Sequence, residues 1–92
     1  MASSTSQVTV TSTATLILAS NSNAKRRTIK NTGSYIVYIG NDANVVVTAN
    51  NAHGGYPLGL GEILYLGDYT GIVYGIVTST SGEVQYIEQE LS

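Results

Sequence analysis

The sequence contains no cysteine, tryptophan or phenylalanine, and it has one proline and one histidine. Without cysteine, these 92 residues form no disulfide, so the fold must be held by its core and by its partners. Charged residues make up 11% of the chain, well below the level of about 25% in an average soluble protein. The surface must therefore consist mostly of serine, threonine, asparagine and glycine. The length fits a single domain.

Charge and hydropathy argue against two classes of partner. The net charge is -2 at pH 7, which gives no general attraction to a polyanion such as nucleic acid. No apolar run approaches the ~20 residues of a membrane-spanning helix. We therefore expect neither nucleic acid nor a membrane as a partner. The N-terminal stretch, MASSTSQ, has neither a basic nor an apolar region, so we do not expect a signal peptide.

Short apolar runs separated by turn residues predict an all-β fold. The runs are rich in β-branched residues and tyrosine, and turn signals recur at intervals of roughly 8–12 residues, as in β-sandwiches and barrels. We expect one antiparallel β-sandwich, jelly-roll-like, with about eight short strands. A flexible N-terminal arm is expected over residues 1–6, and the sandwich over residues 7–92. Strands are expected at 7–11, 15–19, around Ile29, and at 35–39, 44–48, 62–66, 71–78 and 83–88.

The stretch from Arg26 to Gly40 carries the strongest hairpin signal in the sequence. Two β-branched runs flank Asn31-Thr32-Gly33-Ser34, which is a cluster of turn residues. We expect Gly33 to take a positive φ in this turn. The core is expected to contain Leu16, Leu18, Ile29, Val37, Ile39, Ile63, Tyr74, Ile76 and Val84.

No group of residues in the sequence indicates a catalytic or metal site. His53 is alone, whereas zinc needs three or four ligands. The stretch 41–44 is rich in Asn and Asp but lacks the EF-hand spacing, and is interpreted as a turn. One histidine without a G-x-S-x-G motif does not make a hydrolase site, and the acids Glu62, Asp68 and Glu83 lie next to turns. We expect no enzyme activity, no cofactor and no metal.

The basic residues are unevenly placed, because all of them lie between positions 25 and 30. One interpretation is a contact patch for an acidic partner, either nucleic acid or an anionic protein surface. The other is a solvated strand end in which Lys30 pairs with an acid on a neighbouring strand. Stacking aromatics are absent until Tyr35, which argues against nucleic acid. The expected partner-contact residues are Lys25, Arg26, Arg27 and Lys30, together with Ser3, Ser4 and Thr5 of the arm.

The sequence resembles small all-β structural proteins of tailed bacteriophages. The similarity covers most of residues 14–88. The matching features are an apolar strand ending at Leu18-Ala19, a loop ending at Asn23, Thr28-Ile29-Lys30-Asn31-x-Gly33, Val37-Tyr38-Ile39-Gly40, Pro57-Leu58, Leu60-Gly61-Glu62 and an aromatic strand at 72–76. The doubled Arg26-Arg27 and the tyrosine-rich C-terminal half depart from this pattern.

The resemblance implies a virion protein without catalytic residues, made in the host cytoplasm. The expected function is a capsid decoration protein on the exterior of a phage head, bound to the major capsid protein or another virion protein. Few charges are available to guard the edges of the expected sheets, so we expect a homo-oligomer, and the resemblance favours a trimer. The alternative is a host-adhesion or glycan-binding module of a tail or head fibre, in which Tyr56, Tyr69 and Tyr74 stack on sugars.

Overall fold

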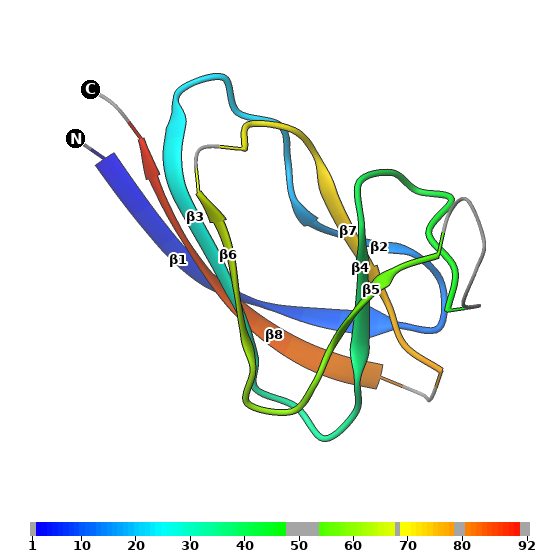
Figure 1. Cartoon of the computed structure of the whole chain (residues 1–92). Helices are drawn as coiled ribbons and strands as arrows, with labels where there is room; N and C mark the ends of the chain where they lie inside the picture. Colours follow the sequence, from blue (N-terminus) through cyan, green and yellow to red (C-terminus); the bar gives the residue numbers. More distant parts are fainter. Residues whose placement is uncertain (1, 48–53, 68, 79–80, 91–92) are drawn as a thin grey trace.

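The computed structural model describes residues 2–47, 54–67, 69–78 and 81–90, which form eight β-strands in two antiparallel four-stranded sheets. The first sheet has the order β1-β8-β3-β6, and the second has the order β2-β7-β4-β5. The two sheets face each other as the layers of a sandwich (Figure 1). The jelly-roll-like β-sandwich predicted from the sequence is confirmed. No helix in the described ranges is long and apolar enough to cross a membrane.

The two sheets differ in strand length. The first sheet consists of β1 (Ala2–Thr11), β8 (Ser81–Glu90), β3 (Ala24–Asn31) and β6 (Ile63–Gly67). The second sheet consists of β2 (Thr15–Leu18), β7 (Val73–Ile76), β4 (Val37–Gly40) and β5 (Tyr56–Leu58). The longest strands therefore all belong to one layer, and part of that layer extends past the shorter one.

Residues 2–6 continue β1, so the predicted flexible arm is wrong for them. Their register with β8 is unbroken, from Ala2 opposite Glu90 to Thr11 opposite Ser81. The sequence pattern missed this extension because it detects side-chain burial, and residues 2–6 contain little apolar surface to bury. What holds them is the backbone ladder to β8, which is equally long.

The stretch from Arg26 to Gly40 is not a hairpin. β3 pairs with β8 and β6, whereas β4 pairs with β7 and β5, so the intervening turn crosses from one sheet to the other. Asn31 organises this crossing. Its side-chain oxygen accepts from the amide of Gly33 at 3.0 Å, and its side-chain nitrogen donates to the carbonyls of Tyr35 and Leu58 at 2.8 and 2.9 Å.

Gly33 does not have the predicted positive φ, which among the described glycines occurs at Gly61 and Gly67. Glycine is required at position 33 for a different reason. A Cβ added to Gly33 would lie 2.7 Å from the backbone nitrogen of Glu83, because the crossing passes directly against β8.

The expected strand at 44–48 is also wrong. Its described part, up to Val47, forms one isolated parallel bridge, between Val46 and Gly54. The neighbour of β4 is instead β5, which contains Pro57 and lies between the expected strands at 44–48 and 62–66, where no strand was predicted. Proline lowers the expectation of a strand, but an edge strand tolerates it.

About half of the predicted core is confirmed. Leu18, Ile29, Val37, Ile39 and Val84 belong to the buried cluster, which also contains Val10, Ile17, Leu58, Val73 and Val77. Leu16 and Ile63 are each 44% exposed, and Tyr74 and Ile76 are only partly buried, so these predictions are wrong.

Two local features reversed the predicted sides of β2 and β7. A register shift between Leu16 and Leu18 turns Leu16 outward and both following side chains inward. In β7 the inward positions include Gly75, which the sequence pattern cannot recognise as core. A Cβ there would lie 2.7 Å from Cδ1 of Ile17, so glycine leaves room for this side chain of the neighbouring strand β2.

Candidate interaction surface

β3 divides the predicted basic cluster between two faces of the first sheet. Lys25, Arg26 and Lys30 are exposed, whereas Arg27 is 1% exposed and points into the sandwich. A register shift between Ala24 and Arg26 precedes this alternation. The four basic residues between positions 25 and 30 therefore have two different roles, because successive side chains of a strand point to opposite faces.

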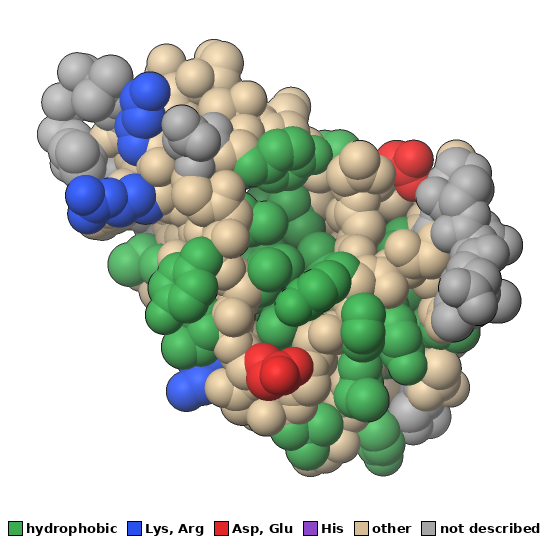
Figure 2. All heavy atoms as spheres, in the orientation of Figure 1, with side chains coloured by type: hydrophobic (Ala, Val, Ile, Leu, Met, Phe, Trp, Pro, Cys, Tyr) green, Lys and Arg blue, Asp and Glu red, His purple; other side chains and the backbone are tan. Residues whose placement is uncertain are grey.

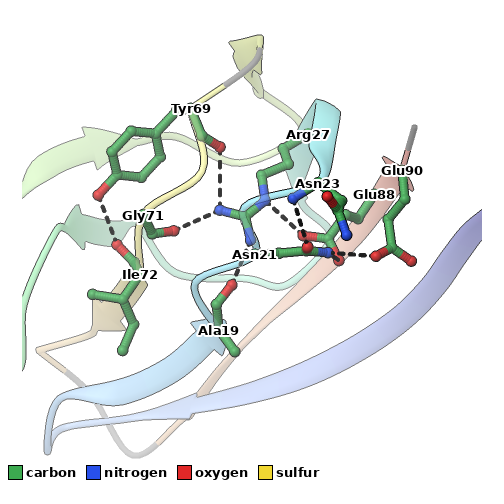
Figure 3. Close-up of polar contacts among 9 residues, drawn as sticks. All are labelled: Ala19, Asn21, Asn23, Arg27, Tyr69, Gly71, Ile72, Glu88 and Glu90. Carbon is green, nitrogen blue, oxygen red and sulfur yellow. Dashed lines mark hydrogen bonds and ion pairs between the residues drawn. The ribbon is translucent and has the colours of Figure 1, made fainter. Parts of the chain in front are cut away.

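Arg27 lies at the centre of a buried polar cluster (Figure 3). Its Nε donates to Oε2 of Glu88 at 2.6 Å. Its Nη1 donates to the carbonyls of Gly71 and Tyr69 at 2.5 and 3.3 Å, and its Nη2 donates to the carbonyl of Ala19. The predicted partner contact at Arg27 is therefore wrong: this guanidinium ties two loops to β8.

Asn21 extends the Arg27 cluster to the end of β8. Its side-chain nitrogen donates to Oε2 of Glu90 at 3.0 Å and to Oε1 of Glu88 at 3.4 Å, and its side-chain oxygen accepts from the amide of Asn23 (Figure 3). Both acids of this end are thus engaged by groups within the chain. The cluster is structural and does not offer an open site.

The solvent side of the first sheet, here called the outer face, collects several of the predicted contact residues. Two rows of side chains cross the four strands in the order β1, β8, β3, β6. The first row is Thr5, Ile87, Thr28 and Tyr65, and the second row is Gln7, Gln85, Lys30 and Ile63. A shallow hollow of about 230 Å³ lies between the rows, lined by Thr5, Thr28, Lys30, Ile63, Gln85, Tyr86 and Ile87.

The outer face combines exposed apolar groups with positive charge. Ile63, Tyr65 and Ile87 are 44%, 74% and 42% exposed. Lys30 lies beside them. Among the described residues, the one ion pair joins Arg27 to Glu88, so the alternative in which Lys30 pairs with an acid on a neighbouring strand is not seen. Glu83 of the same face accepts from Gln7 Nε2 at 2.7 Å and from Thr9.

The structure thus unites Thr5 and Lys30 in one hollow, with Arg26 further along β3 on the same face. Figure 2 shows Lys and Arg side chains along the edge of the molecule formed by the first sheet. Ser3 and Ser4 lie in β1 opposite Gln89 and Glu88. Sequence reasoning missed the apolar members. One signal was available in the sequence: Ile87 lies two residues after Gln85, so the alternation of the strand places it on the same, solvent-facing side as that polar residue.

The second sheet also exposes apolar groups on its solvent side. Leu16 is 44% exposed and lies opposite Tyr74, and the neighbouring outward positions hold Tyr38 and Ile76. Both layers of the sandwich therefore present apolar side chains outward. In a solitary antiparallel sandwich the outward positions are mainly polar.

A cavity of about 410 Å³ opens between the two sheets on the side of β6 and β5. Hydrophobic side chains line this gap in the middle of the face seen in Figure 2. They include Leu64 and Leu66, which point inward from β6 but are only half-buried, and Tyr56 and Tyr69. Tyr69 is oriented by a hydrogen bond from its hydroxyl to the carbonyl of Ile72 at 3.0 Å.

Some of the residues weighed as metal or catalytic candidates in the sequence lie outside the described ranges. His53 and Asp68 lie outside them. Within them, no three His, Cys, Asp or Glu side chains gather. In the stretch 41–44, Oδ1 of Asp42 accepts from the amide of Asn44 at 2.9 Å, which is the hydrogen bond of an Asx turn.

One of three comparisons with known proteins supports the fold. No protein-family profile matches the chain, and no curated protein matches it in sequence. A solved structure of a protein from Bacillus endospore appendages, described as disulfide-linked pili, is similar with a TM-score of 0.55. That similarity covers 99% of this chain and 87% of the other, at 18% sequence identity. At this identity it shows a shared fold and nothing about shared activity.

Proposed function

We propose that this chain is a non-enzymatic structural protein that acts by binding other subunits of a large protein assembly. The observation that carries the proposal is the apolar surface on the solvent sides of both sheets, with Tyr65 and Leu16 as examples. Exposed apolar surface of this kind marks interaction sites. The solved structure with the same fold belongs to an appendage, and its structural role is consistent with the proposal.

In its finer form, the proposal is a decoration protein on the exterior of a tailed-phage head, attached to the major capsid protein or another virion protein. The support is the resemblance over Thr28–Gly33 and Val37–Gly40. The outer face of the first sheet is the candidate attachment surface, because it combines apolar groups with Lys30 and Arg26. Attachment does not use disulfides of these residues, since they contain no cysteine.

Immunogold electron microscopy tests the proposal and separates its forms. An antibody against this chain is applied to the encoding cells and to the particles that they release. Label over phage heads supports decoration. Label along surface filaments supports the structural role but contradicts the phage form. Label that remains in the cytosol, on no assembly, contradicts both.

A glycan-binding module is the second candidate, and one observation favours it. Tyr56 and Tyr69, which are 59% and 39% exposed, line the same cavity between the sheets. Exposed aromatic rings can stack on the apolar faces of sugars. Tyr74, the third expected stacking residue, lies outside this cavity lining.

A glycan array and titration calorimetry test this second function. If the cavity binds a sugar, Tyr56→Ala lowers the affinity at least tenfold. Tyr65→Ala is the matched control, because Tyr65 is 74% exposed and lies outside the cavity lining. Equal losses in the two variants, or no binding by the parent protein, would reject the glycan site.

A further inference from the structure

The four edge strands of the sandwich differ in how they are protected against pairing with another chain. Natural proteins block such pairing with short strands, prolines, charges or bulges. Of the edges, β6 has five residues and a register shift against β3, and ends at Gly67. β2 has four residues and a register shift, and β5 has three residues including Pro57. Each of these three edges carries at least one protective feature.

β1 carries none of these features. It has ten residues and pairs with β8 without a register shift. Its sequence, ASSTSQVTVT, contains no proline, no glycine and no charged residue. It lies at the end of the strand order, and Figure 1 shows it running beside β8. By the general rule for sheet edges, such a strand is a template for another strand.

The hydrogen bonds show which backbone groups of β1 point away from β8. The amide of Thr11 donates to Oγ1 of Thr15, and its carbonyl accepts from the amide of Val77. Both groups of Thr11 therefore point away from β8. Since these directions alternate along an unbroken antiparallel ladder, the same holds for Thr9 and the other odd-numbered residues.

The other side of β8 supports this assignment. Glu83, which lies opposite Thr9, uses its carbonyl to accept from the amides of Thr32 and Gly33. The carbonyl of Glu83 is thus directed away from β1, as expected if Thr9 and Glu83 form a non-hydrogen-bonded pair. Thr5, Gln7 and Thr9 consequently turn their N–H and C=O groups toward the open side of the sheet.

We propose that β1 pairs antiparallel with β1 of a second copy of this chain across a two-fold axis. The two first sheets then join into one sheet of eight strands. We choose a second copy of this chain as the partner because it also has an unprotected β1. Its other described edges are protected, so β1 is the strand that it can offer for pairing. A strand that pairs antiparallel with itself satisfies two-fold symmetry.

The side chains of β1 are compatible with this contact. Thr5, Gln7 and Thr9 lie on the outer face, and they would meet the same uncharged residues of the second copy. No like charges are brought together, and Thr–Thr pairs across strands are favourable. The contact differs from the apolar surfaces behind the proposed function, so either idea can fail alone. It gives a dimer, whereas the expected trimer needs a different interface.

Analytical ultracentrifugation of a proline variant tests the contact. The parent protein is expected to sediment as a dimer at high concentration. Thr5→Pro removes an outward N–H but none of the bonds to β8, so it is expected to shift the protein to monomer with unchanged far-UV circular dichroism. Thr5→Val keeps the N–H and is expected to remain a dimer. A monomeric parent, or a dimeric Thr5→Pro, overturns the proposal.

Cysteine cross-linking gives a second measurement that does not depend on tolerance of proline. Since the chain has no cysteine, single variants Thr5→Cys, Gln7→Cys and Thr9→Cys each introduce one thiol. Each variant is oxidised alone and in a mixture with each of the others. In an antiparallel pair of identical strands, the numbers of any two facing residues add up to the same value. Only combinations of variants that fit one such value are therefore expected to form disulfide dimers. Leu60→Cys, exposed in the loop before β6, is the control. Cross-linking of all combinations alike, or of none, overturns the two-fold pairing.

Discussion

The first sheet has a middle that faces the second sheet and an end that extends beyond it, and the two parts are built differently. In the middle, Ile29 and Val84 belong to the same buried cluster as Val37 of the opposite layer, and all three are fully buried. At the end, Arg27 and Glu88 face the loops that follow β2 and β6.

The difference follows from what the opposite layer offers. A paired sheet presents apolar side chains, because its backbone groups are already bonded to one another. A loop presents carbonyls that need donors. The guanidinium of Arg27 supplies donors in several directions, so it can satisfy the carbonyls of Ala19, Tyr69 and Gly71 and still pair with Glu88. The charge of Arg27 is therefore buried because loops, and not strands, cover this end of the first sheet.

The largest effect is expected from Arg27→Leu. The variant removes the donor of three carbonyls and the positive charge that pairs with Glu88, so the free energy of unfolding should fall by about 3–5 kcal/mol. Arg26→Leu, one residue away on the exposed side, should change it by less than about 0.5 kcal/mol. Urea denaturation measures both. Similar losses in the two variants would contradict the division of the basic cluster.

A double-mutant cycle sharpens this result. If Arg27 and Glu88 act as a pair, Arg27→Leu combined with Glu88→Leu should destabilise the protein by less than the sum of the single variants. Additive losses would mean that the carbonyl bonds of Arg27, and not the ion pair, dominate its contribution.

The next effect concerns two isoleucines on neighbouring strands of the first sheet. Ile29 is fully buried, whereas Ile87 is 42% exposed on the outer face. Ile29→Ala should cost about 2–5 kcal/mol, because it removes buried surface and leaves a cavity. Ile87→Ala should cost less than about 1 kcal/mol. Thermal unfolding of both variants checks this, and a larger loss for Ile87 would mean that the outer face is covered within the monomer.

Side-chain patterns were sufficient to predict the fold class, about half of the core and most strand positions. They failed where a register shift changes which side chains point inward, and where the chain passes from one sheet to the other. Arg27 and Arg26 have the same chemistry, and Arg27 is the buried one because it shares the inward side of β3 with Ile29, along an unbroken part of the register with β8. Residue type alone favours exposure at both positions. Leu16 is turned outward by a register shift in β2, and no residue type marks that shift.

The connection between β3 and β4 was predicted to be a hairpin turn, and this prediction is wrong for a related reason. Asn31 and Gly33 are turn residues in a hairpin and equally in a connection between layers. The distinction depends on which strands lie beside β3 and β4, and these come from distant parts of the chain. The outer face was partly found, through Thr5 and Lys30. Its apolar members were assigned to the core or left out because local patterns do not show which layer a strand joins.

A smaller effect is expected at this crossing. In Gly33→Val the new Cβ would lie 2.7 Å from the backbone nitrogen of Glu83, which cannot move without disturbing β8. The expected destabilisation is about 1–3 kcal/mol. Gly61→Ala is the comparison, because Gly61 has a φ of 76° and no atom within 4 Å of an added Cβ, so only backbone strain of about 1 kcal/mol is expected. An unchanged melting temperature for Gly33→Val would reject the close approach.

The smallest effect on stability, but a large one on attachment, is expected from reversing charge on the outer face. Arg27 is left unchanged in this test, because Arg27→Glu would place a further carboxylate beside Glu88 in the buried cluster. Arg26→Glu with Lys30→Glu changes exposed residues alone and should alter the free energy of unfolding by less than about 0.5 kcal/mol.

Under the proposed attachment to a phage particle, the same double variant should bind more slowly, because exposed charges at the rim of an interface mainly set the association rate. High salt should slow the parent protein in the same direction. Occupancy of purified particles, measured by quantitative electrophoresis over time and at two salt concentrations, checks both effects. Tyr65→Ala should instead shorten the residence time of the bound protein, because Tyr65 is the most exposed of the large apolar side chains on this face. Normal loading by both variants would place the attachment surface on the second sheet, around Leu16 and Tyr74.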